Sequence, residues 1–190
     1  MKRRWGAILG AAVMGLTLAA CGSAVAPTTT TTTAVTTTTL ATVASCTSSQ
    51  LTLTSSSMGG VGHIGVTVVF TNRSRTTCSL YGYPGVAALN AAGQQVVQAV
   101  RTTSGYLGGV ASGATAPIVD LQPGQSASAT VEGTDVPVGS ATSCPTYPRL
   151  LVTPPNTTVS TTVTASLPGC SPVQVHPVVP GTSGYYDPTS

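Results

Sequence analysis

The stretch GHIGVTVVFTN, residues 62–72, decides the fold class of this chain. Every second side chain in it is apolar, and these side chains would share one face of an extended strand: Ile64, Val66, Val68 and Phe70. The positions between them carry mostly small or polar residues. A period of two is typical of a strand with one face against a core, so we predict a half-buried β-strand here.

Similar short patterns recur along the rest of the chain and are separated by turn residues. Further strands are expected around residues 78–80 and over residues 86–89, 94–100, 118–121, 126–132, 150–153, 159–165 and 173–179. The sequence NAAG at 90–93 predicts a hairpin turn, and QPG at 122–124 places Pro and Gly at the centre of another turn. No helical period interrupts this series. We therefore predict an all-β fold, an Ig-like antiparallel β-sandwich.

Five cysteines occur in the sequence, and four of them lie in the region that is expected to fold: Cys46, Cys78, Cys144 and Cys170. An even number of cysteines in an exported chain predicts two disulfides, for which three pairings are possible. No Cys-x-x-Cys pair occurs, which argues against a zinc site, and we expect neither a metal nor a cofactor.

The N-terminus has the organisation of a bacterial lipoprotein signal. Lys2, Arg3 and Arg4 precede an apolar run over residues 5–20, which is too short to span a bilayer comfortably. The run leads into LAAC at 18–21, which matches a lipobox. We therefore predict a signal peptide over 1–20 and lipidation of Cys21. The lipid would anchor the protein on the extracytoplasmic face of the cell membrane.

Residues 21–45 predict a lipidated, disordered linker. They include two threonine runs and show no apolar period. Pulled straight, the linker would reach up to ~80 Å from the membrane. The folded domain is expected over 46–180, and residues 181–190 are expected to form a flexible C-terminal tail.

The charge of the mature chain excludes one class of partner. The full sequence has seven Lys and Arg and four Asp and Glu residues, and three of the cations leave with the signal peptide. Four cations then stand against four anions, which gives no net side-chain charge. A neutral surface offers no electrostatic basis for binding nucleic acid.

Two histidines are the candidates for a catalytic base, His63 and His176. A serine hydrolase would need one of them beside a serine and a carboxylate. Both alternate with apolar residues on predicted strands, so we interpret them as solvent-facing polar positions. Glu132 and Asp135 could form a carboxylate pair, but their place at a strand end predicts solvated side chains instead.

Residues outside the predicted core mark two further surfaces. The glycine-rich segment 105–113 carries Tyr106 and Leu107, which could anchor a partner, although a flexible loop is the simpler interpretation. The segment lacks the Lys and the Ser or Thr of a P-loop. Tyr81 and Tyr83 could stack on a glycan, but a role in the core or in a turn is the simpler interpretation.

Three stretches resemble a domain family of unknown function found in secreted proteins and lipoproteins of actinobacteria. They are VVFTN at 68–72, CSLYGYPGV at 78–86 and LQPG at 121–124. The resemblance covers Cys46 to about Val179. It implies an Ig-like sandwich with disulfides joining Cys46 to Cys78 and Cys144 to Cys170. It implies no catalytic residue and no ligand.

Together these features predict a lipid-anchored lipoprotein of the bacterial cell envelope, whose domain is a non-catalytic binding or structural module. Its expected contacts are the membrane, through the lipid on Cys21, and an envelope glycan or protein of unknown identity. The alternative is a small envelope hydrolase that uses a serine with His63 or His176.

Overall fold

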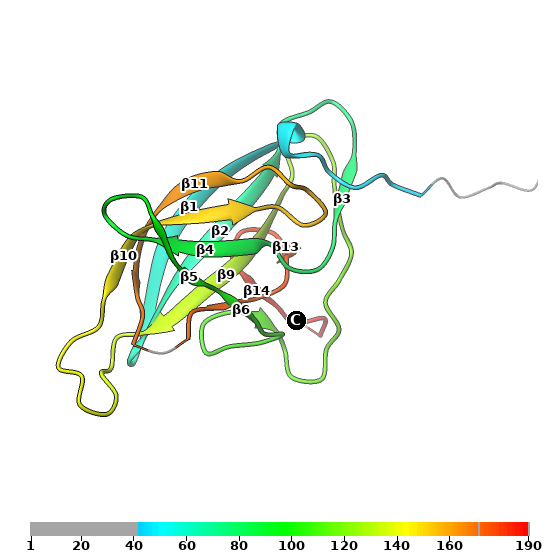
Figure 1. The fold of residues 1–190 in the computed structure, drawn as a ribbon. Helices are drawn as coiled ribbons and strands as arrows, with labels where there is room; N and C mark the ends of the chain where they lie inside the picture. The colour runs from blue at the N-terminus through cyan, green and yellow to red at the C-terminus, as the bar shows by residue number, and fades with distance from the viewer. Residues whose placement is uncertain (1–41, 171, 190) are drawn as a thin grey trace, which may run out of the picture. The chain divides into compact units, whose positions relative to one another are not determined.

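The structure is a computed structural model, and it describes residues 42–170 and 172–189 of the 190-residue chain (Figure 1). The predicted signal peptide over 1–20, the lipidated Cys21 and most of the predicted linker lie outside the described residues. Across the two described ranges, no helix combines the length and hydropathy needed to cross a bilayer.

β-Strands are almost the only regular secondary structure in the described part of the chain. A single 3-10 turn, η1 (Ser48–Gln50), precedes them. The strands are β1 (Leu51–Gly60), β2 (His63–Asn72), β3 (Cys78–Leu80), β4 (Gly85–Leu89), β5 (Gln95–Gln98), β6 (Val100–Arg101), β7 (Gly109–Val110), β8 (Val119–Leu121), β9 (Ser126–Thr134), β10 (Thr146–Thr153), β11 (Thr161–Pro168), β12 (Gln174–Val175), β13 (Val179–Pro180) and β14 (Tyr185–Tyr186).

The larger sheet has the order β1-β2-β9-β12-β6, and β13 also pairs with β9. Strands β1 and β2 form a long antiparallel hairpin that runs from the pair Leu51–Asn72 to the pair Gly60–His63. Strand β9 lies antiparallel to β2 on its other side. The sequence predicts an antiparallel sheet. The short pair β12–β6 is parallel, so this prediction is wrong for that pair.

The second sheet has the order β11-β10-β4-β5 and is antiparallel throughout. In Figure 1 it lies in front of β1, β2 and β9. Apolar side chains of both sheets are buried in one core cluster, for example Val66, Phe70, Val131, Leu150 and Val152. The predicted β-sandwich class is therefore confirmed, with alternation of apolar residues as its cause.

Two predicted strands are each divided in the structure. The predicted strand over 94–100 is divided at Ala99 between β5 in one sheet and β6 in the other. The predicted strand over 173–179 is divided into β12 and β13, with Pro177 between them. Proline has no N–H for a sheet ladder, which accounts for this second break.

Both disulfides have the pairing that the resemblance implies, Cys46–Cys78 and Cys144–Cys170. We call them the first and the second disulfide. The first belongs to the core, since its two cysteines are 2% and 1% exposed. The second is half-buried and joins the segment before β10 to the residue that follows Gly169.

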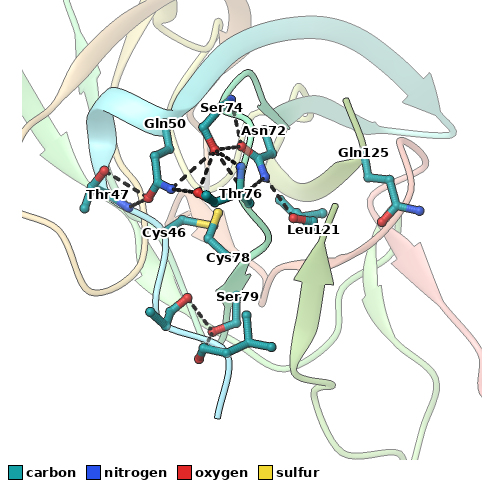
Figure 2. The surroundings of a disulfide bond; sticks show 12 residues. Cys46, Thr47, Gln50, Asn72, Ser74, Thr76, Cys78, Ser79, Leu121 and Gln125 are labelled. Atoms are coloured by element: carbon teal, nitrogen blue, oxygen red, sulfur yellow. Dashed lines mark hydrogen bonds between the residues drawn. A yellow bond between two sulfur atoms is a disulfide. The ribbon is translucent and has the colours of Figure 1, made fainter. Parts of the chain in front are cut away.

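Close to the first disulfide, the buried side chain of Asn72 links three segments (Figure 2). Its Nδ2 donates to the carbonyls of Thr76 and Leu121, each at 2.8 Å. Its Oδ1 accepts from the backbone N–H of Ser74 at 2.9 Å and from the Ser74 hydroxyl at 2.7 Å. Both amide hydrogens and the amide oxygen therefore have partners, as a buried amide requires.

Candidate functional site

The polar face of the central strand β9 forms the candidate site. Residues at odd positions of β9 belong to the sandwich core, and the even positions lie on the opposite face. That second face is buried as well: Ser128 and Thr130 are fully buried, and Glu132 is 3% exposed. Residues 102–111 and the C-terminal segment cover it.

The C-terminal segment, for which the sequence predicts flexibility over 181–190, is bound to this face. The Gly184 N–H donates to Ser128 Oγ at 2.9 Å, and Thr130 Oγ1 donates to the Gly184 carbonyl at 3.2 Å. Strand β14 then pairs in parallel with β7. Gly184 has a φ of +72°, and a Cβ there would collide with the Thr130 side chain. Only glycine allows the chain to approach β9 this closely.

Glu132 holds the glycine-rich segment against the sheet. Its carboxylate oxygens accept hydrogen bonds from the backbone N–H of Tyr106, at 3.0 Å, and of Leu107, at 2.8 Å. Hydrogen bonds to an ionised carboxylate are stronger than those between neutral groups. The segment for which a flexible loop is the simpler prediction is therefore held in one place by a buried side chain.

His176 lies beside Glu132 and is fully buried. Its Nε2 is 3.5 Å from Glu132 Oε2 and has no hydrogen-bond partner. Its Nδ1 lies 3.1 Å from both the hydroxyl and the carbonyl oxygen of Thr102. Gly105 covers the pair so closely that a Cβ on it would overlap both Glu132 and His176.

The prediction that Glu132 and His176 face solvent is wrong. Alternation along β9 and β12 correctly separates them from the apolar core positions. It cannot reveal that a second layer covers the outer face, because that layer is formed by irregular segments without a period. The signals in the sequence are the glycines Gly105 and Gly184, whose missing side chains allow the close approach.

His63 and Tyr106 meet at the edge of the same region. Their rings are stacked with centroids 4.4 Å apart, and Tyr106 remains 61% exposed. Leu107 is half-buried, with its side chain next to Gly60 and Gly65. Tyr106 rather than Leu107 is therefore the residue of this segment that is available to a partner.

The remaining predicted candidates lie elsewhere. Asp135 is exposed just beyond the end of β9, so it forms no buried carboxylate pair with Glu132. Tyr81 and Tyr83 line an open pocket together with Thr103. Tyr81 is 52% exposed, and the Tyr83 hydroxyl lies 3.2 Å from Thr103 Oγ1.

The chemistry of the site follows from its enclosure. An imidazole between a hydroxyl and a carboxylate is the arrangement that activates a nucleophile in triad enzymes. Here the hydroxyl belongs to Thr102, and the imidazole has no exposed surface. Within the described residues, no three His, Cys, Asp or Glu side chains group as metal ligands would.

The fold and this enclosed site define a disulfide-stabilised β-sandwich with a buried pair of ionisable side chains, Glu132 and His176. The chain belongs to the family described as a domain of unknown function, DUF4232, whose model matches residues 46–179. No curated protein and no solved structure matches the chain.

Proposed function

We propose that this protein is a lipid-anchored module of the bacterial cell envelope that binds or supports a partner and turns over no external substrate. The observation that carries the absence of turnover is the complete burial of His176. An imidazole that Gly105 seals from solvent cannot reach a substrate from outside.

The location rests on two features. The lipobox at 18–21 supplies the anchor, and two disulfides are typical of an oxidising compartment outside the cytoplasm. Changing Cys21 to Ser removes the thiol that would carry the lipid. We expect the wild-type protein in the membrane fraction with incorporated palmitate, and Cys21→Ser in the soluble fraction without it. Wild-type protein that takes up no palmitate would contradict the anchor.

The contact surface proposed for the partner is the end of the sandwich around Tyr106. Val61 on the β1–β2 turn is 89% exposed, and Val136 beyond β9 is 54% exposed. Val136 lies against Gly62 of the same turn, and Tyr106 lies against Gly60. Exposed apolar and aromatic side chains on a rigid frame are typical of binding surfaces.

A photo-crosslinking amino acid tests this surface in intact cells. We expect a specific crosslinked species when it replaces Tyr106 and none when it replaces Val96. Val96 is 49% exposed but lies on the edge strand β5, which makes it a matched control. Identical crosslinking from both positions, or none from either, would contradict the proposed surface.

A hydrolase remains the alternative, and the structure offers it little support. The two ring nitrogens of His176 face Thr102 and Glu132 rather than a serine, and His63 is stacked on Tyr106. Purified protein should therefore hydrolyse no ester or amide substrate. Activity that disappears in His63→Ala or His176→Ala would overturn the proposed function.

A further inference from the structure

Four polar side chains converge on the outer face of the larger sheet: Thr102, Glu132, Gln174 and His176. The pairing of strands β6, β12 and β9 brings these residues together. Strand β12 pairs in parallel with β6, with Gln174 opposite Val100, and in antiparallel fashion with β9, with Gln174 opposite Glu132. Continuing the parallel register brings His176 level with Thr102. Alternation then places all four side chains on one face.

Neighbouring groups of this array lie 3.0–3.5 Å apart. Thr102 Oγ1 donates to Gln174 Oε1 at 3.0 Å and lies 3.1 Å from His176 Nδ1. His176 Nε2 lies 3.5 Å from Glu132 Oε2. A hydroxyl therefore has a base on one side and an amide carbonyl on the other, and both belong to its own chain.

We propose that Thr102 and Gln174 become joined by an intramolecular ester that this array forms without any other protein. The Thr102 hydroxyl oxygen attacks Cδ of Gln174, and a C–O bond forms. The bond between Cδ and the amide nitrogen breaks, and ammonia leaves. The Thr102 hydroxyl donates to Gln174 Oε1 in the structure, so it first rotates its hydrogen toward His176 Nδ1, and the proton then passes from Nδ1 to the departing nitrogen. Atoms and charge balance without an oxidant, a reductant or a cofactor.

His176 acts as the base in this step. It accepts the proton at Nδ1 only in the tautomer that carries hydrogen on Nε2. The Glu132 carboxylate favours that tautomer, because in the other one a lone pair of Nε2 would face an anion. The Thr102 carbonyl, 3.1 Å from Nδ1, favours the opposite tautomer, so the imidazole must turn Nδ1 from this carbonyl to the Thr102 hydroxyl before it accepts the proton. Glu132 is itself fixed by the backbone N–H groups of Tyr106 and Leu107, so it is a positioning residue.

The surroundings favour ester formation over hydrolysis. His176 is fully buried, Glu132 is 3% exposed, and Gly105 covers both, so bulk water is kept from the base. Holding both reactants in one folded chain supplies a high effective concentration. The product would tie the two-residue strand β6 to β12 by a covalent bond in addition to its few hydrogen bonds. This inference does not depend on the membrane anchor or on the identity of the partner.

Peptide mapping of the purified full chain tests the ester directly. Trypsin cleaves after Arg101 and Arg149, which puts Thr102 and Gln174 on separate peptides. The second disulfide also joins these peptides, so it is first reduced and alkylated. We expect one branched species whose mass equals the sum of the two peptides less one ammonia. Hydroxylamine should release the two peptides, since it cleaves esters. Two separate, unmodified peptides would overturn the proposal.

Variants assign the roles of the residues. Thr102→Val removes the nucleophile and should abolish the branched species, whereas Thr102→Ser should retain it. Thr103→Val is the matched control, because it changes the neighbouring threonine, whose hydroxyl contacts only Tyr83 in the described structure. A branched species that persists in Thr102→Val would contradict the assignment of Thr102.

The rate of linking after refolding separates chemistry from structure. His176→Asn should slow it by roughly 100-fold or more, which is the contribution of a general base. Glu132→Gln should slow it by a smaller factor and change the pH profile of the rate, which a purely structural role would leave unchanged. If both variants link at the wild-type rate, the base is not His176.

Discussion

Among single residues, Asn72 connects the FTN stretch to the LQPG stretch. Its side chain donates to the Leu121 carbonyl, and its backbone N–H and C=O both form hydrogen bonds with the turn that follows Leu121. The Asn72 N–H donates to the Gln125 carbonyl at 2.9 Å, and the Asn72 carbonyl accepts from Gly124 at 2.8 Å. One buried asparagine thus fixes the turn between β8 and β9 against the end of β2.

Replacing Asn72 with Ala should lower the free energy of unfolding by about 2–4 kcal/mol. The substitution removes the hydrogen bonds of the Asn72 amide and leaves the buried Leu121 carbonyl without its side-chain donor. Urea unfolding measures it. Gln122→Ala, at an exposed position on the same turn, should change stability by less than about 0.5 kcal/mol. Equal effects of the two substitutions would mean that the Asn72 amide does not hold the turn.

Gly105→Ala should lower the free energy of unfolding by about 1–3 kcal/mol, because the new methyl group overlaps Glu132 and His176 and must lift the segment. Gly85→Ala serves as the control, since a Cβ there meets only ordinary contacts with Thr153. Thermal or urea unfolding of both variants checks this. A Gly105→Ala protein as stable as the control would show that the segment does not lie tightly on the buried pair.

At the scale of elements, the C-terminal segment behaves as part of the outer layer. It supplies carbonyl acceptors to the glycine-rich segment: Gly109 donates to Gly184 at 2.8 Å, and Ala111 donates to Tyr186 at 2.9 Å. These bonds connect β7 to β14. Each of these strands has only two residues, which is too short for an alternating pattern to be recognised in the sequence.

Ending the chain after Pro180 should open the rest of the outer layer, the glycine-rich segment, to solvent. The amides of Gly109 and Ala111 would lose their acceptors, so we expect their hydrogen exchange to accelerate at least tenfold, a consequence of local opening. Amides of β4, which pairs with β10 in the other sheet, should keep their protection. Unchanged exchange at Gly109 would show that its protection does not come from the C-terminal segment.

The elements that could be predicted from the sequence are those with one face in the core. Strand β2 and the β4–β5 hairpin follow from their alternation and from the turn at 90–93. Strand β1 was not predicted, since serines replace apolar residues along its second half. The candidate site escaped prediction because its partners are joined through backbone groups of residues 105–107, which have no side-chain pattern.

At the scale of the whole domain, the two disulfides should contribute unequally. Replacing either pair of cysteines by alanine should cost about 2–4 kcal/mol through the freedom gained by the unfolded chain. Removing Cys46 and Cys78 should cost more, because their sulfur atoms also fill the core. Urea unfolding of the two double variants gives the comparison, and an equal or reversed order would contradict the packing contribution.

The position of the first disulfide also determines how the domain responds to traction. A force that pulls on the segment before Cys46 passes through the sulfur bridge to Cys78. Residues 47–77, which include the whole β1–β2 hairpin, are bypassed by the load and cannot be drawn out while the bridge is intact. Extension must therefore begin beyond Cys78. A protein held by its N-terminal side would keep this hairpin folded at pulling forces that unfold other parts of the chain.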